Sequence, residues 1–324
     1  MNPLAHQTRT PLAAAVAFGL LLAFGSPLSA SLRDRNAASR ADLAADDSLD
    51  DGADDLAPAA LPANIRLVRD VPYGPDARQR FDVYLPAAAR AAPIIVMVHG
   101  GAWRFGDKAA QAVVENKVAR WVPRGFIVVS ANYRLLPKVD PIEQARDVAR
   151  ALAAVQARAA SWGGDRARCI LMGHSAGAHL VSLLATSPSL SAGLVPSPWL
   201  GTISLDSAAL DVVEIMEARH ARFYSRAFGR DPAYWRAASP YRALTGAARP
   251  MLLVCSTRRA DSCAQSDRFA ARAASCGVRA AVLPEDFSHQ EINQRLGGDP
   301  RYTAAVEAFM ASLDPHVAEL LAGR

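Results

Sequence analysis

Motifs that bind metals, nucleotides or dinucleotides are missing from this sequence. Its four cysteines, at positions 169, 255, 263 and 276, do not have the spacing of a metal-binding motif. The chain contains no glycine-rich dinucleotide fingerprint, no phosphate-binding P-loop and no zinc signature. No internal repeat is evident. We therefore expect the protein to act without a cofactor.

Clustered positive charge is also missing, although the formal net charge is +5. Residues 31–63 carry eight aspartates against three arginines, so the rest of the chain is clearly basic. A basic surface can attract nucleic acid or an anionic membrane. Here the arginines are dispersed and no recognition motif accompanies them. We predict a solvated surface that at most favours acidic substrates, and no nucleic-acid partner.

Near the N-terminus, the apolar run Pro11–Phe24 is too short to span a membrane comfortably. It follows a weakly positive start and precedes small residues that end at Ala30, which is the pattern of a secretory signal. We predict that residues 1–30 are a signal peptide cleaved after Ala30, and that the protein is exported to the periplasm or secreted. Leu28 is larger than the cleavage site prefers, so an uncleaved membrane anchor is the alternative.

Large apolar side chains are scarce in residues 31–63, which are rich in alanine and aspartate. Such a segment cannot bury enough surface to offset the entropy of the chain, so we predict a disordered linker. The folded domain is expected at residues 64–324, which is long enough to bury a large core.

The domain is expected to begin with two antiparallel strands, Ile65–Val71 and Arg80–Leu85, joined by a turn at Gly74–Asp76. Six short, continuously apolar runs follow, as is typical of strands buried on both faces of a parallel sheet. These runs are residues 93–99, 126–130, 169–172, 200–205, 251–255 and 280–283. Helical stretches separate them at about 109–122, 141–161, 176–186, 262–275 and 302–313. The alternation predicts an α/β fold with a doubly wound, mostly parallel sheet and ligand chemistry at the carboxyl ends of the strands.

One interval, about 207–247, is longer than a crossover between strands needs and is rich in aromatic residues. We predict a helical lid insertion in which Phe223, Tyr224 and Trp235 contact substrate. The alternative is that these aromatic side chains form only the insertion's own small core.

A serine lies where an apolar strand breaks into a helix. Gly173–Gly177 reads G-x-S-x-G with Ser175 at its centre, Ile170–Met172 precedes it, and helix-forming residues follow. This is the strand-turn-helix context of a nucleophile elbow. The alternative reading of Ser175 is a helix N-cap in a glycine-containing turn.

A nucleophilic serine needs a base, and the base needs an orienting acid. His289, in the loop expected after the last strand, is the best candidate base. The acid is expected after the strand 251–255, where Asp261 is the first carboxylate; its alternative role is a helix N-cap. Asp206 and Asp211, after the preceding strand, are held in reserve.

Backbone amides must also stabilise a developing oxyanion. Ala176 follows the nucleophile directly and supplies one amide. The segment His99–Trp103 follows a strand, and Gly100, Gly101 and Ala102 are expected to supply the others. Trp103 is then expected to form a flat wall of the site.

Five motifs together resemble those of the α/β-hydrolase superfamily, and most closely its carboxylesterases related to kynurenine formamidase (arylformamidase), hormone-sensitive lipase and bacterial feruloyl-esterase-like enzymes. The motifs are His99–Trp103, Ser130–Leu135, Gly164–Asp165, Gly173–His179 and Ser288–His289. The resemblance implies Ser175 as nucleophile, Asp261 and His289 as its partners, and the His-Gly-Gly-x-Trp loop as oxyanion hole. Alanine replaces the third glycine of the lipase-type loop, which favours the formamidase-like branch. The loop Arg258–Cys263 is unusual for the family.

These residues predict a serine hydrolase acting on a small-molecule ester or amide through an acyl-enzyme. The expected substrates are short-chain or aryl carboxylic esters, or aryl formamides such as N-formylkynurenine. A peptidase or an acyltransferase on the same triad is one alternative, and a catalytically silent binding module is another. The intact serine, histidine and oxyanion loop argue against the silent form, because binding alone does not need all of them.

The cysteines have a structural interpretation. Cys169 and Cys255 fall on buried strands and can serve as small apolar residues. Cys263 and Cys276 flank one predicted helix and are separated by about 20 Å at ~1.5 Å per residue, which forbids a bond between them. A Cys255–Cys263 bridge is geometrically feasible in an exported protein.

Overall fold

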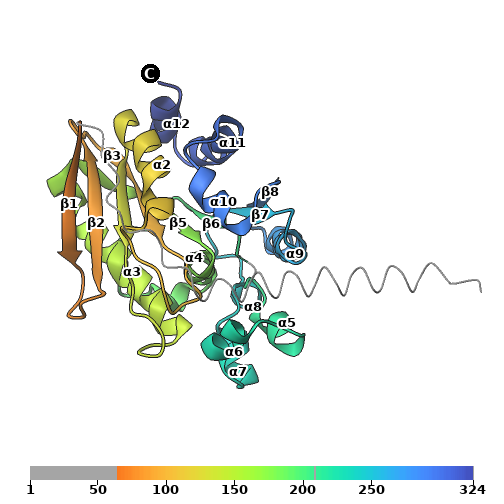
Figure 1. Ribbon diagram of the computed structural model, residues 1–324. Helices are drawn as coiled ribbons and strands as arrows, with labels where there is room; N and C mark the ends of the chain where they lie inside the picture. The colour runs from red at the N-terminus through yellow and green to blue at the C-terminus, as the bar shows by residue number, and fades with distance from the viewer. Residues whose placement is uncertain (1–63, 208, 324) are drawn as a thin grey trace, which may run out of the picture. The chain divides into compact units, whose positions relative to one another are not determined.

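An eight-stranded sheet forms the centre of the protein (Figure 1). The structure is a computed structural model that describes residues 64–207 and 209–323, all of them within the unit Ala41–Arg324. The predicted signal peptide and linker lie outside the described residues. The strand order is β1-β2-β4-β3-β5-β6-β7-β8. The strands are β1 Ile65–Pro72, β2 Arg80–Pro86, β3 Ala92–Val98, β4 Ile127–Ala131, β5 Gly164–His174, β6 Gly201–Leu205, β7 Met251–Ser256 and β8 Ala280–Glu285.

Strands β1 and β2 pair antiparallel, and β2 pairs antiparallel with β4, whereas all the other pairs are parallel. The predicted α/β fold and its mostly parallel sheet are therefore confirmed. The carboxyl ends of β5, β6 and β7 lie side by side, because β6 pairs with both of its neighbours. This edge of the sheet carries the candidate site.

Core side chains alternate between the two faces of the sheet. Along β3, Ile94, Val96 and Val98 enter one hydrophobic cluster, whereas Ile95 and Met97 enter the other. Each residue of β3 is buried. Continuous apolar runs, rather than alternating ones, are needed for a strand that is covered on both faces.

Helices cover both faces. Those whose buried residues join the first cluster are α3 Pro141–Arg158, α4 Ala176–Thr186 and α9 Ser262–Ser275. Those that join the second are α2 Gln111–Trp121, α10 His289–Arg295, α11 Pro300–Ala311 and α12 Pro315–Leu321. Helices α10 and α12 were not expected from the sequence. Each begins at a side-chain cap: Ser288 accepts from the Glu291 amide, and Asp314 accepts from the amides of His316 and Val317.

Four short helices occupy the interval between β6 and β7, where the sequence predicts a helical insertion. They are α5 Val212–Glu217, α6 Arg222–Phe228, α7 Pro232–Ala237 and α8 Pro240–Ala243. They pack against one another, and α8 also packs against α4, the helix that follows Ser175 (Figure 1). The insertion is thereby held next to the carboxyl ends of the central strands.

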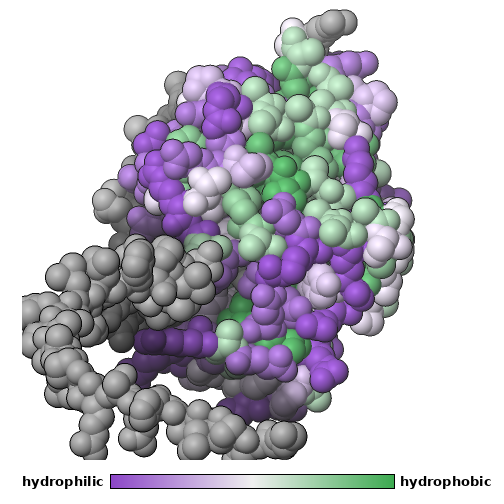
Figure 2. Space-filling view, turned by 90° about the vertical axis from the view of Figure 1, so that its right-hand side faces the viewer, coloured by the Kyte–Doolittle hydropathy of each residue, from purple (hydrophilic) through white to green (hydrophobic). Residues whose placement is uncertain are grey.

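The surface is mixed in character. Figure 2 shows one face, on which hydrophilic residues are interspersed with hydrophobic ones. Leu194, at 39% exposure, is the one large hydrophobic residue classed as exposed among residues 64–207 and 209–323. Within the same residues, no helix has the length and apolar character that crossing a membrane requires.

Candidate active site

Ser175 lies in the sharp turn between β5 and α4, in the strained conformation expected of a nucleophile elbow. Its φ is 54°, in the left-handed region that non-glycine residues rarely adopt. The flanking glycines make the turn feasible: a Cβ atom at Gly177 would lie 2.3 Å from the carbonyl oxygen of Val98, and one at Gly173 would lie 2.4 Å from the Gly177 oxygen. The Ser175 side chain forms no capping hydrogen bond to α4, so the N-cap reading does not describe it.

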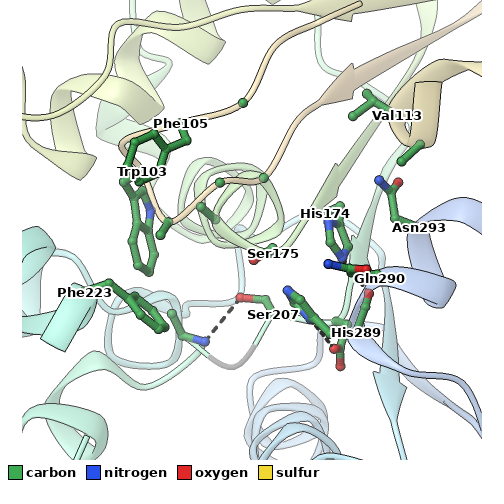
Figure 3. Close-up of a pocket in the computed structure, with 18 of the residues that line it drawn as sticks. Trp103, Phe105, Val113, His174, Ser175, Ser207, Phe223, His289, Gln290 and Asn293 are labelled. Atoms are coloured by element: carbon green, nitrogen blue, oxygen red, sulfur yellow. Dashed lines mark hydrogen bonds and ion pairs between the residues drawn. The ribbon is translucent and has the colours of Figure 1, made fainter. Parts of the chain in front are cut away.

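His289 faces the same cavity as Ser175 (Figure 3). It is the first residue of α10 rather than part of a loop, and Ser288 caps that helix with a complete capping box. Its Nδ1 lies 2.6 Å from Oδ2 of Asp206, the contact drawn as a dashed line. A histidine that donates Nδ1–H to a carboxylate leaves Nε2 free to accept a proton.

The structure does not bring Asp261 to His289, as the sequence-based choice of acid requires. Asp261 is exposed at the start of α9, it forms no capping hydrogen bond there, and the carboxylate that contacts His289 is that of Asp206. Asp211, the other reserve, caps α5 and pairs with Arg242. The physical reason is distance along the chain: Asp206 directly follows the last residue of β6, whereas Asp261 follows β7 only after four intervening residues. That immediate adjacency to the end of β6 is the sequence signal that could have identified Asp206.

The carboxylate of Asp206 is completely buried and receives several hydrogen bonds. Oδ1 accepts from the Ser256 amide at 2.8 Å and from the Ser262 hydroxyl, and Oδ2 accepts from Arg259 at 3.0 Å as well as from His289. Burial opposes ionisation of this group. The charge of Arg259 and the hydrogen bonds from His289 and Ser262 outweigh burial and hold the pKa of Asp206 well below its ordinary range. Asp206 is therefore a carboxylate at neutral pH.

The segment after β3 folds into a tight loop over Ser175. Gly101, Ala102 and Trp103 all have positive φ, and a Cβ atom at Gly100 would lie 3.0 Å from that of Ser175. Among the hydrogen bonds of residues 64–207 and 209–323, none is donated by the backbone amide of Gly101, Ala102 or Ala176. All of these residues line the cavity. The geometry suits them as donors to an oxyanion.

His99 braces this loop. It is buried, its ring stacks on Tyr133 with 4.5 Å between ring centroids, and its Nδ1 donates to the Gly100 oxygen at 2.7 Å. Arg78 lies 3.3 Å from its other ring nitrogen. Burial lowers the pKa of His99 to about 4, so the ring is neutral at physiological pH.

Aromatic side chains form one wall of the cavity, which has a volume of about 400 Å³. Trp103, Phe223 and Tyr224 line it, and the rings of Phe223 and Tyr224 lie 4.2 Å apart. Trp235 does not line it, so its predicted contact with substrate is wrong. Its indole donates instead to the Phe228 carbonyl at 3.1 Å, and it borders a second cavity on the insertion. Trp235 thus fits the alternative reading, in which aromatic side chains of the insertion form its own small core.

Two further histidines lie near Ser175, and both are buried and hydrogen-bonded. His174 donates from Nε2 to the His289 carbonyl at 2.9 Å, and burial lowers the pKa of His174 well below its ordinary value. The ring centroids of His174 and His289 are 4.5 Å apart. His179 is buried in α4 and hydrogen-bonded, and burial lowers its pKa to about 4. A neutral His174 thus supports the backbone of the base.

Cys255 and Cys263 form a disulfide, with their Cα atoms 5.1 Å apart. The bridge joins the buried end of β7 to the first turn of α9. It closes the loop that carries Ser256, Arg259 and Ser262, the three residues that contact Asp206. Cys169 and Cys276 are free.

Known proteins share this architecture. A truncated carbohydrate esterase from gut microbiota superimposes with a TM-score of 0.67 at 17% identity, covering 78% of this chain and 98% of its own. Esterase B from Lactobacillus Rhamnosis (HN001) gives a TM-score of 0.64 at 21% identity, covering 90% and 96%. At these identities the likeness shows the fold. In addition, the BD-FAE family model matches residues 81–196. The chain has the α/β-hydrolase fold.

Sequence similarity to a known esterase is partial. Esterase LipQ of Mycobacterium tuberculosis (strain ATCC 25618 / H37Rv) is 33% identical over 201 residues, which are 57% of this chain and 47% of LipQ. The chain thus spans about half the length of that relative. The BD-FAE match includes Ser175 and the oxyanion loop but ends before Asp206 and His289. The contact between Asp206 and His289 is therefore an observation from the structure of this chain alone.

Proposed function

We propose that this α/β-hydrolase is a serine esterase that cleaves short-chain or aryl carboxylic esters through an acyl-enzyme. The observation that carries the proposal is the pair formed by His289 Nδ1 and Asp206 Oδ2, 2.6 Å apart, beside a strained Ser175 in one cavity. The similarity to an esterase, LipQ, supports the same reaction class. The proposal that the protein is exported rests on the sequence of residues 1–30 alone.

In the proposed reaction, Ser175 Oγ attacks the ester carbonyl while His289 Nε2 takes its proton. Asp206 holds the imidazole in the required tautomer and stabilises the imidazolium that forms. The amides of Gly101, Ala102 and Ala176 stabilise the negative oxygen of the tetrahedral intermediate. His289 then donates the proton to the leaving alcohol. Water, deprotonated by the same histidine, then attacks the acyl-enzyme, and His289 returns the proton to Ser175 Oγ as the acid is released.

The walls of the cavity favour small acyl groups and flat leaving groups. Trp103 closes one side and is itself packed against Phe228, with 4.8 Å between ring centroids, so it is fixed in place. Phe223 and Tyr224, from the insertion, add two more aromatic faces. A cavity of about 400 Å³ holds a small aryl ester but leaves little room for a long chain, although each buried methylene adds about 0.8 kcal/mol.

The test is a series of nitrophenyl esters from acetate to laurate, with N-formylkynurenine as an amide substrate. We expect kcat/KM to be highest for acetyl or butyryl esters and to fall beyond about eight carbons, because longer chains gain no further burial. A kcat/KM that keeps rising with chain length would contradict the size argument. Preferential cleavage of N-formylkynurenine would move the assignment to aryl formamides.

The nucleophile is tested on the same substrates. Ser175→Ala should lose several orders of magnitude in kcat and keep its fold, and a fluorophosphonate probe should label the native protein at Ser175. Ser187→Ala, which removes a hydroxyl just after the end of the same helix, is a matched control that should hydrolyse normally. Full activity in Ser175→Ala would refute the proposed function.

A further inference from the structure

The loop between the two bridged cysteines surrounds the acid of the site. Residues 256–262 supply three donors to the carboxylate of Asp206: the Ser256 amide, the Ser262 hydroxyl and the Arg259 guanidinium. Two of these donors bind Oδ1. Oδ2 is thereby left for His289 and Arg259 together.

Arg259 stands against both members of the acid–base pair. Its Nη1 lies 3.0 Å from Asp206 Oδ2, 3.3 Å from the Asp206 carbonyl oxygen and 2.9 Å from His289 Nδ1. The same Nδ1 is 2.6 Å from Oδ2. Three groups, a cation, an anion and an imidazole nitrogen, therefore meet in one triangle. The Arg259 side chain is only 19% exposed, so water screens its charge weakly.

Only one arrangement of hydrogens in this triangle allows His289 to act as a base. If Nδ1 carries its hydrogen, it donates to Asp206, and Nε2 can accept the proton of Ser175. If Nδ1 instead accepted from Arg259, the hydrogen would sit on Nε2 and the histidine could not deprotonate the serine. The ionised Asp206, at the shorter distance, selects the first arrangement. Arg259 then binds Oδ2 and keeps the carboxylate oriented toward the ring.

We propose that Arg259 is a positioning residue that fixes the carboxylate of Asp206 against the ring of His289. This inference rests on the proposed esterase function and adds a residue that holds its acid in place. When Arg259 holds Oδ2, the carboxylate accepts Nδ1–H in one orientation, so Nε2 of His289 stays free to accept the proton of Ser175.

The other basic groups around His289 do not hold the carboxylate of Asp206. On β5, His174 is neutral because burial lowers its pKa. Beside α10, Arg258 is paired with Asp286 and Glu291, so its charge is offset. Behind α10, buried Lys117 donates to the Asn293 carbonyl and contacts neither ring nitrogen of His289. Among the described residues, Asp206 and Arg259 are thus the charged side chains in direct contact with the His289 ring.

The test compares kcat and KM for nitrophenyl acetate in three variants. In Arg259→Met, kcat should fall at least about tenfold while KM stays near its wild-type value, because the carboxylate positions a base that acts in the transition state. Arg259→Lys keeps a cation for Oδ2 and should recover most of the lost kcat. Arg258→Met is the matched control, because Arg258 is half exposed and contacts Asp286 and Glu291 instead. It should leave both constants unchanged.

The rate at which a fluorophosphonate labels Ser175 gives a second readout, because labelling requires only an activated serine and shows that each variant is folded. It should fall in Arg259→Met and recover in Arg259→Lys. A wild-type kcat in Arg259→Met, in a protein that requires Ser175, would refute the role of Arg259 and leave the esterase proposal intact. Wild-type hydrolysis in Ser175→Ala would refute the esterase proposal, and the role of Arg259 with it.

Discussion

His179 joins the oxyanion loop to the insertion. Its Nδ1 accepts a hydrogen bond from the indole of Trp103 at 3.1 Å, and its Nε2 donates to the carbonyl of Ala238 at 2.7 Å. The ring is fully buried, and its centroid lies 5.5 Å from that of Phe228. One neutral imidazole therefore satisfies two buried polar groups from two separate segments, and both segments border the active site.

His179→Leu should therefore weaken both stability and catalysis. The substitution leaves the Trp103 indole and the Ala238 carbonyl buried without a partner, at about 1–3 kcal/mol each. A looser oxyanion loop should lower kcat more than it raises KM, because the oxyanion forms only in the transition state. Urea denaturation and nitrophenyl acetate kinetics measure the two effects. His220→Leu is the control, because His220 is a partly exposed histidine of the insertion. Equal losses of stability and kcat in the two variants would contradict the prediction.

The identity of the acid can be tested by two matched substitutions. Asp206→Asn should lower kcat by about 10³–10⁴-fold, because the amide no longer selects the tautomer that leaves Nε2 free. Asp261→Asn should retain nearly wild-type activity, since its side chain is exposed and does not contact His289. Steady-state kinetics on one ester settle the comparison. A loss confined to Asp261→Asn would return the acid to the loop after β7.

The disulfide should stabilise the fold and the position of Asp206 together. Closing a loop with a sequence separation of 8 contributes about 2–3 kcal/mol in the chain-entropy account. The double variant Cys255→Ser with Cys263→Ser should lose that amount in urea denaturation, and its kcat should fall because the loop supplies three donors to Asp206. Cys276→Ser removes a free thiol and is the control. Unchanged stability and kcat in the double variant would show that the loop holds its shape without the bridge.

Lys117 should make stability depend on pH in the alkaline range. Burial lowers the pKa of Lys117 from 10.5 to about 7. The unfolded chain therefore binds more protons than the folded protein between these pH values, and the free energy of unfolding should rise with pH across them, by up to about 1.4 kcal/mol per unit from this group.

Lys117→Met should flatten that rise, as measured by urea denaturation at pH 7, 8 and 9. Lys138→Met, whose side chain is 68% exposed, should keep the wild-type slope. If the free energy of unfolding rises with pH equally in the wild type and in Lys117→Met, the pKa of the buried amine is not lowered.

Much of the architecture is local and could be predicted from the sequence. Continuous apolar runs predict strands that are buried on both faces, as β3 is. Helices α4, Ala176–Thr186, and α9, Ser262–Ser275, have the bounds that the sequence predicts, because helix-forming residues fill both segments. The strained turn at Ser175 also follows from neighbouring residues, since the two glycines around it admit the backbone contacts that the turn requires.

What the tertiary structure alone decided is which distant side chains meet. Asp206 and His289 are 83 residues apart, and whether His289 contacts an acid after β6 or after β7 depends on how β5, β6 and β7 are ordered and how α10 begins. The residues around Asp261 do not indicate how far its carboxylate lies from His289 in the folded protein. Trp235 was misplaced for the same reason. An indole suits the wall of a substrate pocket, but this one donates to the Phe228 carbonyl within the insertion. Local patterns fix elements, because their causes lie within a few residues, whereas contacts between elements depend on the packing of the whole sheet.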